Sequence, residues 1–224
     1  MQAIMETLFD IVYLSTVISL GIIMIRKSGD KMQYKLFGLM AVLLGAGDAF
    51  HLVPRSYALL TTGLEANAGA LGVGKLITSI TMTIFYVILY SIWRKRYNIT
   101  DNKNLTIIIY LLAVIRIALC LFPQNDWLNY YATVSWGIYR NIPFAIIGII
   151  IIWLFYKESK IHNDSGLRFM WLAIVLSFGF YIPVVLWAST MRWIGILMIP
   201  KTLAYVWVVL MGYNEFKANL REVK

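Results

Sequence analysis

The chain has 224 residues, of which 60% are hydrophobic and only 14% charged, and its mean hydropathy is +0.73. A soluble domain carries about 25% charged residues, so this composition excludes an ordinary soluble protein and indicates an integral membrane protein. The net charge of +9 would suggest nucleic-acid binding in a soluble chain, but the positions of the basic residues give another explanation.

Seven apolar segments are long enough to cross a bilayer, which requires about 17–25 helical residues. In chain order they run from Leu8 to Ile25, Leu36 to Val53, Val73 to Trp93, Leu105 to Phe122, Trp136 to Tyr156, Phe169 to Ala188 and Ile194 to Tyr213. They lack the alternation of membrane-spanning strands, and a backbone in lipid must satisfy its own hydrogen bonds. The sequence therefore predicts an all-α membrane protein with seven transmembrane helices.

The basic residues of the connecting segments predict the orientation. They lie after the first and third helices, between the fifth and sixth, and after the seventh: Arg26, Lys27, Lys31, Lys35, Arg94, Lys95, Arg96, Lys103, Lys157, Lys160, Arg168, Lys217, Arg221 and Lys224. Cytoplasmic loops carry the excess of lysine and arginine. We therefore expect a multi-pass protein of the cell membrane with its N-terminus outside and its C-terminus in the cytoplasm. Topology and contact with anionic lipid heads then explain the positive charge, and no nucleic-acid partner is needed.

A weak internal repeat relates the second and sixth predicted helices. Phe37, Ala41, Leu44 and Gly47 align without gaps to Phe169, Ala173, Leu176 and Gly179. This match predicts a single membrane domain with a parallel three-plus-one-plus-three repeat. Its first three-helix unit would cover residues 1–97, the linker helix 98–126, and the second unit 127–224. Parallel repeats in transporters place the substrate site at their interface.

Six basic residues fall in the predicted outer half of the spanning region, where charge is costly: Arg55, Lys75, Arg116, Arg140, Arg192 and Lys201. A charged side chain at the centre of a bilayer costs at least ~2.5–3.5 kcal/mol. Asp48 is the one clearly intramembrane carboxylate, since Asp10 lies at the start of the first predicted span. Arg55 and Arg192 suit a loop or interface, whereas Arg116 and Lys201 lie too deep for easy snorkelling. We therefore expect them to face protein or water.

Further polar residues of the same region extend this basic group. Asp48, His51 and Arg55 follow one another at spacings that share a helix face, so Asp48 and His51 can share a proton or a hydrogen bond. Arg140 could bind a ligand or form a structural bridge to Asp48. The candidate ligand-binding residues are Asp48, His51, Lys75, Arg116, Arg140, Asn141, Tyr181, Lys201 and Tyr205.

Guanidinium and ammonium groups in a low-dielectric site bind phosphate or carboxylate. The main hypothesis is therefore an outward-facing basic cavity that binds an anionic small molecule or a lipid headgroup, in a transporter or a receptor. Asp48 and His51 would titrate with binding and couple it to protons, because histidine changes charge near neutral pH.

Three alternatives remain open at this stage. An intramembrane enzyme could use Asp48 and His51 as its catalytic acid and base on an anionic lipid, although no metal cluster and no HExxH or Gly-x-Ser-x-Gly pattern is present. A retinal protein could use Lys201, with Asp48 as its counter-ion. A structural membrane subunit would leave the one-sided basic group unexplained. No cofactor is indicated, and the single cysteine, Cys120, excludes an internal disulfide.

Overall fold

The computed structural model describes residues 2–130, 134–188 and 190–222. Within these ranges the chain forms seven long α-helices, which are α1 (Gln2–Lys27), α2 (Met32–Leu60), α3 (Ala68–Arg96), α4 (Lys103–Leu121), α5 (Val134–Ile161), α6 (Met170–Trp187) and α7 (Met198–Glu222). Two short 3₁₀ segments, η1 (Pro123–Asn125) and η2 (Arg192–Leu197), precede α5 and α7. In the described part of the chain, seven helices are long and apolar enough to cross a membrane. The prediction of an all-helical, seven-span protein is confirmed to this extent.

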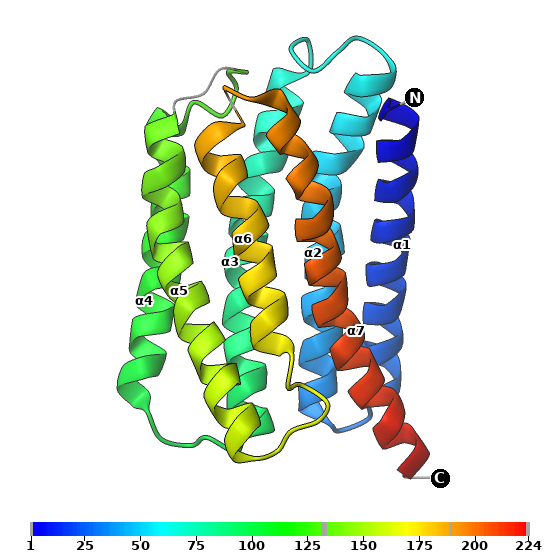
Figure 1. The fold of residues 1–224 in the computed structure, drawn as a ribbon, viewed down its shortest axis with the longest axis vertical. Helices are drawn as coiled ribbons and strands as arrows, with labels where there is room; N and C mark the ends of the chain where they lie inside the picture. The colour runs from blue at the N-terminus through cyan, green and yellow to red at the C-terminus, as the bar shows by residue number, and fades with distance from the viewer. Residues whose placement is uncertain (1, 131–133, 189, 223–224) are drawn as a thin grey trace.

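The helices stand side by side in one bundle (Figure 1). Each helix packs against its neighbours in the chain, and α1 also contacts α7, which closes the bundle. The third helix additionally contacts α5, and the second contacts α7. The start of α1 and the end of α7 lie at opposite ends of the bundle, at the top and the bottom of Figure 1. We call these the N-terminal end and the C-terminal end.

The second and third helices are longer than the sequence predicted. We expected α2 to end at Val53 and α3 to begin at Val73, but the helices continue to Leu60 and start at Ala68. Pro54 lies inside α2, and membrane helices tolerate proline where neighbouring groups satisfy the backbone. The turn after Pro54 is also tied to α1 by side-chain contacts described below. The connection is therefore short, and not a long loop.

The seventh helix begins later than predicted. The sequence placed its start at Ile194, whereas η2 occupies residues 192–197 and α7 starts at Met198. Pro200 consequently lies in the first turn of the helix, where the missing backbone N–H has no intrahelical partner to lose. This position lets the helix begin close to Lys201, one of the candidate site residues.

Small residues allow the first two helices and the α3 entrance to pack closely. A Cβ atom added to Gly38 would lie 2.7 Å from the Gly21 carbonyl oxygen of α1. One added to Gly72 would lie 1.4 Å from the Trp127 carbonyl oxygen. Such close backbone contacts are typical of helix packing in membranes. The aromatic core lies mainly around α3, where Phe85 and Tyr86 are fully buried.

Candidate functional site

Polar and aromatic side chains from all seven helices meet between the middle of the bundle and its N-terminal end. We call this group the central cluster. Its members are Tyr13 (α1), Asp48 (α2), Tyr86 (α3), Arg116 (α4), Asn141 and Phe144 (α5), Ser177 and Tyr181 (α6), and Lys201 and Tyr205 (α7). Six of the nine residues that the sequence singled out belong to it.

Asp48 is held by a tyrosine of the first helix. The Tyr13 hydroxyl donates a hydrogen bond of 2.7 Å to Oδ2 of Asp48. The positive charge of Lys201 also acts on Asp48, although the described residues include no ion pair of 4.0 Å or less between the two. The carboxylate therefore has one direct partner and one cation at longer range.

Lys201 is buried among aromatic rings. Its residue is only 7% exposed, and Nζ lies 5.2 Å from the centroid of the Tyr181 ring and 5.5 Å from that of Tyr205. A cation within about 6 Å of a ring face is attracted by the ring quadrupole. This environment stabilises the ammonium group partly. No described residue forms a hydrogen bond or ion pair of 4.0 Å or less with Nζ, so its three N–H donors can bind an oxygen ligand.

Arg116 is the most unusual residue of the central cluster. It is 2% exposed, and its guanidinium carbon lies 3.3 Å from the centroid of the Phe144 ring. Its Nε and Nη1 atoms have no hydrogen-bond partner among the residues that the structure describes. The guanidinium does form a hydrogen bond with the Cys120 thiol, but a thiol is a weak acceptor. A buried cation with unmade hydrogen bonds is costly, so this guanidinium is suited to an anionic partner.

Aromatic side chains connect the surroundings of Arg116 with those of Lys201. The Tyr86 hydroxyl lies 3.4 Å from the Ser177 hydroxyl and 3.3 Å from the Tyr205 hydroxyl. The Phe144 ring, over which the Arg116 guanidinium lies, packs against two tyrosine rings. Its centroid is 4.9 Å from that of Tyr86 and 6.4 Å from that of Tyr181. The two buried cations thus share one shell of tyrosine and phenylalanine rings.

Asn141 joins the fifth and sixth helices at this site. The Tyr181 hydroxyl donates a hydrogen bond of 3.3 Å to Oδ1 of Asn141. The Asn141 amide nitrogen donates to the carbonyl oxygen of Gly137, at 2.8 Å. Tyr181 therefore touches both Lys201, through its ring face, and α5, through its hydroxyl.

Three polar contacts join α1 to α2 on the N-terminal side of the bundle. Arg55 forms an ion pair with Glu6, the Ser56 hydroxyl donates to Oδ2 of Asp10 at 3.2 Å, and Tyr13 binds Asp48. Arg55 is therefore neutralised at a helix interface, which agrees with its expected interface position. Glu6, Asp10 and Tyr13 recur at spacings of four and three and share one face of α1.

Three candidate site residues lie outside the central cluster. Lys75 is exposed. Arg140 donates a hydrogen bond of 2.7 Å to Oδ1 of Asn125 and lies over the Trp127 ring at 4.3 Å, so the considered bridge to Asp48 is not formed. His51 places Nδ1 3.3 Å from the carbonyl oxygen of Leu71.

The hydrogen bond that Asp48 and His51 could share is not formed in the structure. The two residues share a helix face, but each side chain contacts a different neighbouring helix: Asp48 binds Tyr13 of α1, and His51 faces Leu71 of α3. The choice of partner depends on how α2 is rotated between α1 and α3, which residue spacing alone does not define. The side chain of Arg192 lies outside the described residues.

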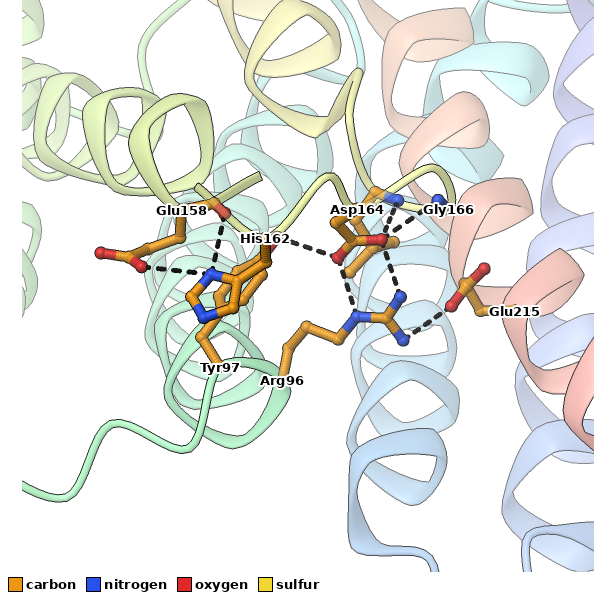
Figure 2. A network of polar contacts seen from close by, with 8 residues as sticks. Arg96, Tyr97, Glu158, His162, Asp164, Gly166 and Glu215 are labelled. Carbon is orange, nitrogen blue, oxygen red and sulfur yellow. Dashed lines mark hydrogen bonds and ion pairs between the residues drawn. The ribbon is translucent and has the colours of Figure 1, made fainter. Parts of the chain in front are cut away.

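A second polar group, the C-terminal-end network, was not predicted from the sequence. Figure 2 shows Arg96 between two carboxylates, with Nη2 2.7 Å from Oδ1 of Asp164 and Nη1 2.6 Å from Oε2 of Glu215. Asp164 also accepts hydrogen bonds from the Tyr97 hydroxyl, at 3.0 Å, and from the Gly166 backbone N–H, at 3.1 Å. The network ties α3 and α7 to the connection between α5 and α6.

Charge and burial shift the ionisation of this network. Burial alone would raise the pKa of Asp164, but its hydrogen bonds with Arg96 and the charge of that guanidinium hold the pKa below 3.8. Burial, followed by the negative charge of Asp164, raises the pKa of Tyr97 above its usual value. Both shifts keep the ion pair and its tyrosine donor intact at neutral pH.

Two surface pockets of the described residues lie away from the buried cations. A pocket of about 420 Å³ lies at the N-terminal end and is lined by residues such as Glu65 and Asp126. Another, of about 370 Å³, lies between the end of α5 and the start of α6. Neither is lined by Arg116 or Lys201. The buried cations are packed among rings in this conformation, so an anion would reach them only if side chains separated.

Four residues of the central cluster were not singled out from the sequence: Tyr13, Tyr86, Phe144 and Ser177. For Tyr13 a signal was present, because it continues the Glu6–Asp10 spacing towards the middle of the first helix. The other three lie within long apolar runs and resemble ordinary packing residues. Only the arrangement of the helices brings them to Arg116 and Tyr205.

Comparison with known proteins finds no relative of this chain. Family models, curated proteins and solved structures were searched, and none of them matches this chain.

Proposed function

We propose that this multi-pass membrane protein binds an anionic small molecule or a lipid headgroup at Arg116 and Lys201, and that it acts as a transporter or a receptor. The observation that carries this proposal is the unsatisfied, buried guanidinium of Arg116. A carboxylate or phosphate oxygen could accept a hydrogen bond from Nε or from Nη1, and such charge-assisted hydrogen bonds are among the strong ones. Lys201, whose Nζ atom lies near the Tyr181 and Tyr205 rings, would add a second cation.

The charge balance of the central cluster supports an anionic ligand. Its members include two buried cations, Arg116 and Lys201, and one carboxylate, Asp48, which already accepts the Tyr13 hydroxyl. An anion would bring the group close to neutrality. Asp48 would then respond to binding through Lys201, and this link is the basis for the proposed coupling to protons.

Ligand-dependent thermal unfolding of the purified protein in detergent tests the proposal. Succinate, inorganic phosphate and an alkyl phosphate serve as probes, with chloride at equal ionic strength as the blank. A probe at one hundred times its Kd stabilises a protein by about 2.7 kcal/mol. We expect at least one probe to raise the unfolding temperature of the wild type, and to lose this effect with Arg116→Gln or Lys201→Gln.

Arg55→Gln provides the matched control. It removes the same charge at the same end of the bundle, but from a guanidinium that is already paired with Glu6. The variant should keep the full ligand-induced shift. If no anion stabilises the wild type, or if Arg55→Gln abolishes the shift as well, the proposed site is wrong.

Uptake into reconstituted vesicles distinguishes the two proposed roles. A labelled form of the stabilising anion should accumulate in vesicles that contain the wild type if the protein is a transporter. Binding without uptake indicates a receptor. A dependence of uptake on an inward pH gradient, lost in Asp48→Asn, would support proton coupling.

The proposed orientation can be tested separately from the anion site. We place the N-terminal end outside the cell, because the basic connections lie at the opposite end. We also keep the parallel repeat of α1–α3 and α5–α7 as a proposal, with α4 between the units, where it packs against α3 and α5. Cysteine labelling of Thr62→Cys from outside intact cells would test the orientation.

A further inference from the structure

The pocket at the C-terminal end of the bundle is built from three kinds of residue. One lysine, Lys160, and one arginine, Arg168, line it together with small polar residues and aromatic rings. Its volume is about 370 Å³. It lies between the last turns of α5 and the first turn of α6, next to the C-terminal-end network of Figure 2. None of its lining residues belongs to the central cluster.

Aromatic rings, and not carboxylates, hold the two cations. The Nζ atom of Lys160 donates a hydrogen bond of 2.6 Å to the Tyr156 hydroxyl and lies 4.3 Å from the centroid of that ring. The guanidinium carbon of Arg168 lies 4.5 Å from the centroid of the Phe169 ring. Neither cation forms an ion pair within the described ranges of the chain. Both therefore keep their charge available to an anion.

The one carboxylate that lines the pocket is already neutralised. Asp164 accepts two hydrogen bonds from Arg96, at 2.7 and 2.8 Å, and one from Tyr97 (Figure 2). The backbone N–H groups of Gly166 and Leu167 also point to it. These contacts hold the connection between α5 and α6 in place, and they remove the repulsion that a free carboxylate would exert on an anion.

The aromatic residues of the pocket place it at the membrane surface. The Tyr156 and Trp171 rings pack edge to face, with centroids 5.3 Å apart, and Tyr156 and Phe169 are 39% and 41% exposed. Tyrosine and tryptophan favour the headgroup region of a bilayer. Basic pockets between helices in this region bind phosphate-bearing lipid heads.

We propose that this pocket binds the phosphate group of an anionic lipid headgroup, with Lys160 and Arg168 as its cationic contacts and Ser165 as a hydroxyl donor. The acyl chains would leave past the exposed faces of Tyr156 and Phe169. This site is independent of the proposed anion site at Arg116 and Lys201, so either can fail without the other.

Native mass spectrometry of the intact protein tests the proposal. The protein is released from vesicles that contain equal amounts of phosphatidylcholine and phosphatidylglycerol, and the bound lipid is identified. Wild type should retain phosphatidylglycerol. The variant with Lys160→Ala and Arg168→Ala should bind it about thirty-fold more weakly, which follows from about 1 kcal/mol for each cation near the surface.

Lys157→Ala is the matched control for the loss of charge. Lys157 lies one turn before Lys160 and Ile161 on the same helix, its side chain is 49% exposed, and it does not line the pocket. This variant should retain phosphatidylglycerol as the wild type does. A loss equal to that of the double variant would indicate a general effect of charge and overturn the proposed site, as would full retention by the double variant.

Ser165→Asp keeps the test valid if the double variant does not fold. Ser165 is exposed, so the change should preserve the fold while placing a negative charge in the pocket. Phosphatidylglycerol should be lost, and unchanged retention would refute the proposal.

Inorganic phosphate at millimolar concentration identifies the source of the phosphate group. Failure to displace the lipid supports a headgroup site, whereas displacement overturns the lipid as ligand.

Discussion

Replacing Arg116 with methionine should stabilise the ligand-free protein. Methionine has a similar length and no polar N–H group, so it fills the space beside Phe144 without burying a charge. The two donors without partners, Nε and Nη1, cost about 1–3 kcal/mol each. The contact with the Phe144 ring, at 3.3 Å, offsets about 2 kcal/mol of this cost. We therefore expect a net gain of about 2 kcal/mol in the free energy of unfolding.

Thermal unfolding followed by circular dichroism at 222 nm measures this gain. For a chain of this size, a change of 1 kcal/mol shifts the unfolding temperature by about 2–4 °C, so Arg116→Met should unfold about 4–8 °C higher than the wild type in the same detergent. The same variant should lose the stabilisation by anions. A more stable protein that has lost its ligand is the expected result of removing a binding residue.

Arg140→Met is the comparison that can refute this reasoning. Arg140 has partners, since it donates to the buried Asn125 at 2.7 Å and lies over the Trp127 ring. Its removal should lower the free energy of unfolding by about 2 kcal/mol. If Arg116→Met lowers stability by a similar amount, its guanidinium has a structural role, and the argument from unmade hydrogen bonds is wrong.

Three further predictions, the last of them with a matched control, concern other parts of the bundle. Tyr13→Phe removes the hydrogen bond to Asp48 and should lower the free energy of unfolding by about 1.5–3 kcal/mol, measured in denaturant; no change would mean that the bond does not contribute. Asp164→Asn should destabilise the wild-type fold by about 3 kcal/mol at pH 7. Because the folded-state pKa of this carboxyl is depressed, its contribution is present above pH 3.8 and is lost as the pH falls further, so wild type and variant should converge in acid. Gly72→Ala should destabilise the protein by about 3 kcal/mol or more, because its Cβ would overlap the Trp127 carbonyl oxygen and overpack this contact. Gly179→Ala, whose Cβ would meet nothing within 4 Å, should instead stabilise the helix by about 0.5–1 kcal/mol.

The number of helices could be predicted from the sequence because it depends on a local quantity. An apolar run of about 20 residues crosses a bilayer whatever its neighbours are, and the chain contains seven such runs. The burial of Arg116 and Lys201 was also predictable, because the position of each in its run leaves no short route to water. The ends of helices were less predictable. Pro54 marked an end in the sequence, but contacts between α1 and α2 extend the helix beyond it.

The partner of each polar side chain was decided by the tertiary structure. Asp48 and His51 share a helix face, yet they contact different neighbours, because α2 lies between α1 and α3. Arg96, Asp164 and Glu215 meet across three separate parts of the chain. Residue spacing defines which side chains share one helix face, whereas the rotation and closure of the bundle define which faces meet. For this reason the sequence alone determined a seven-helix membrane protein with buried cations. Only the folded bundle determined that two N–H donors of Arg116 have no hydrogen-bond partner among the residues that the structure describes.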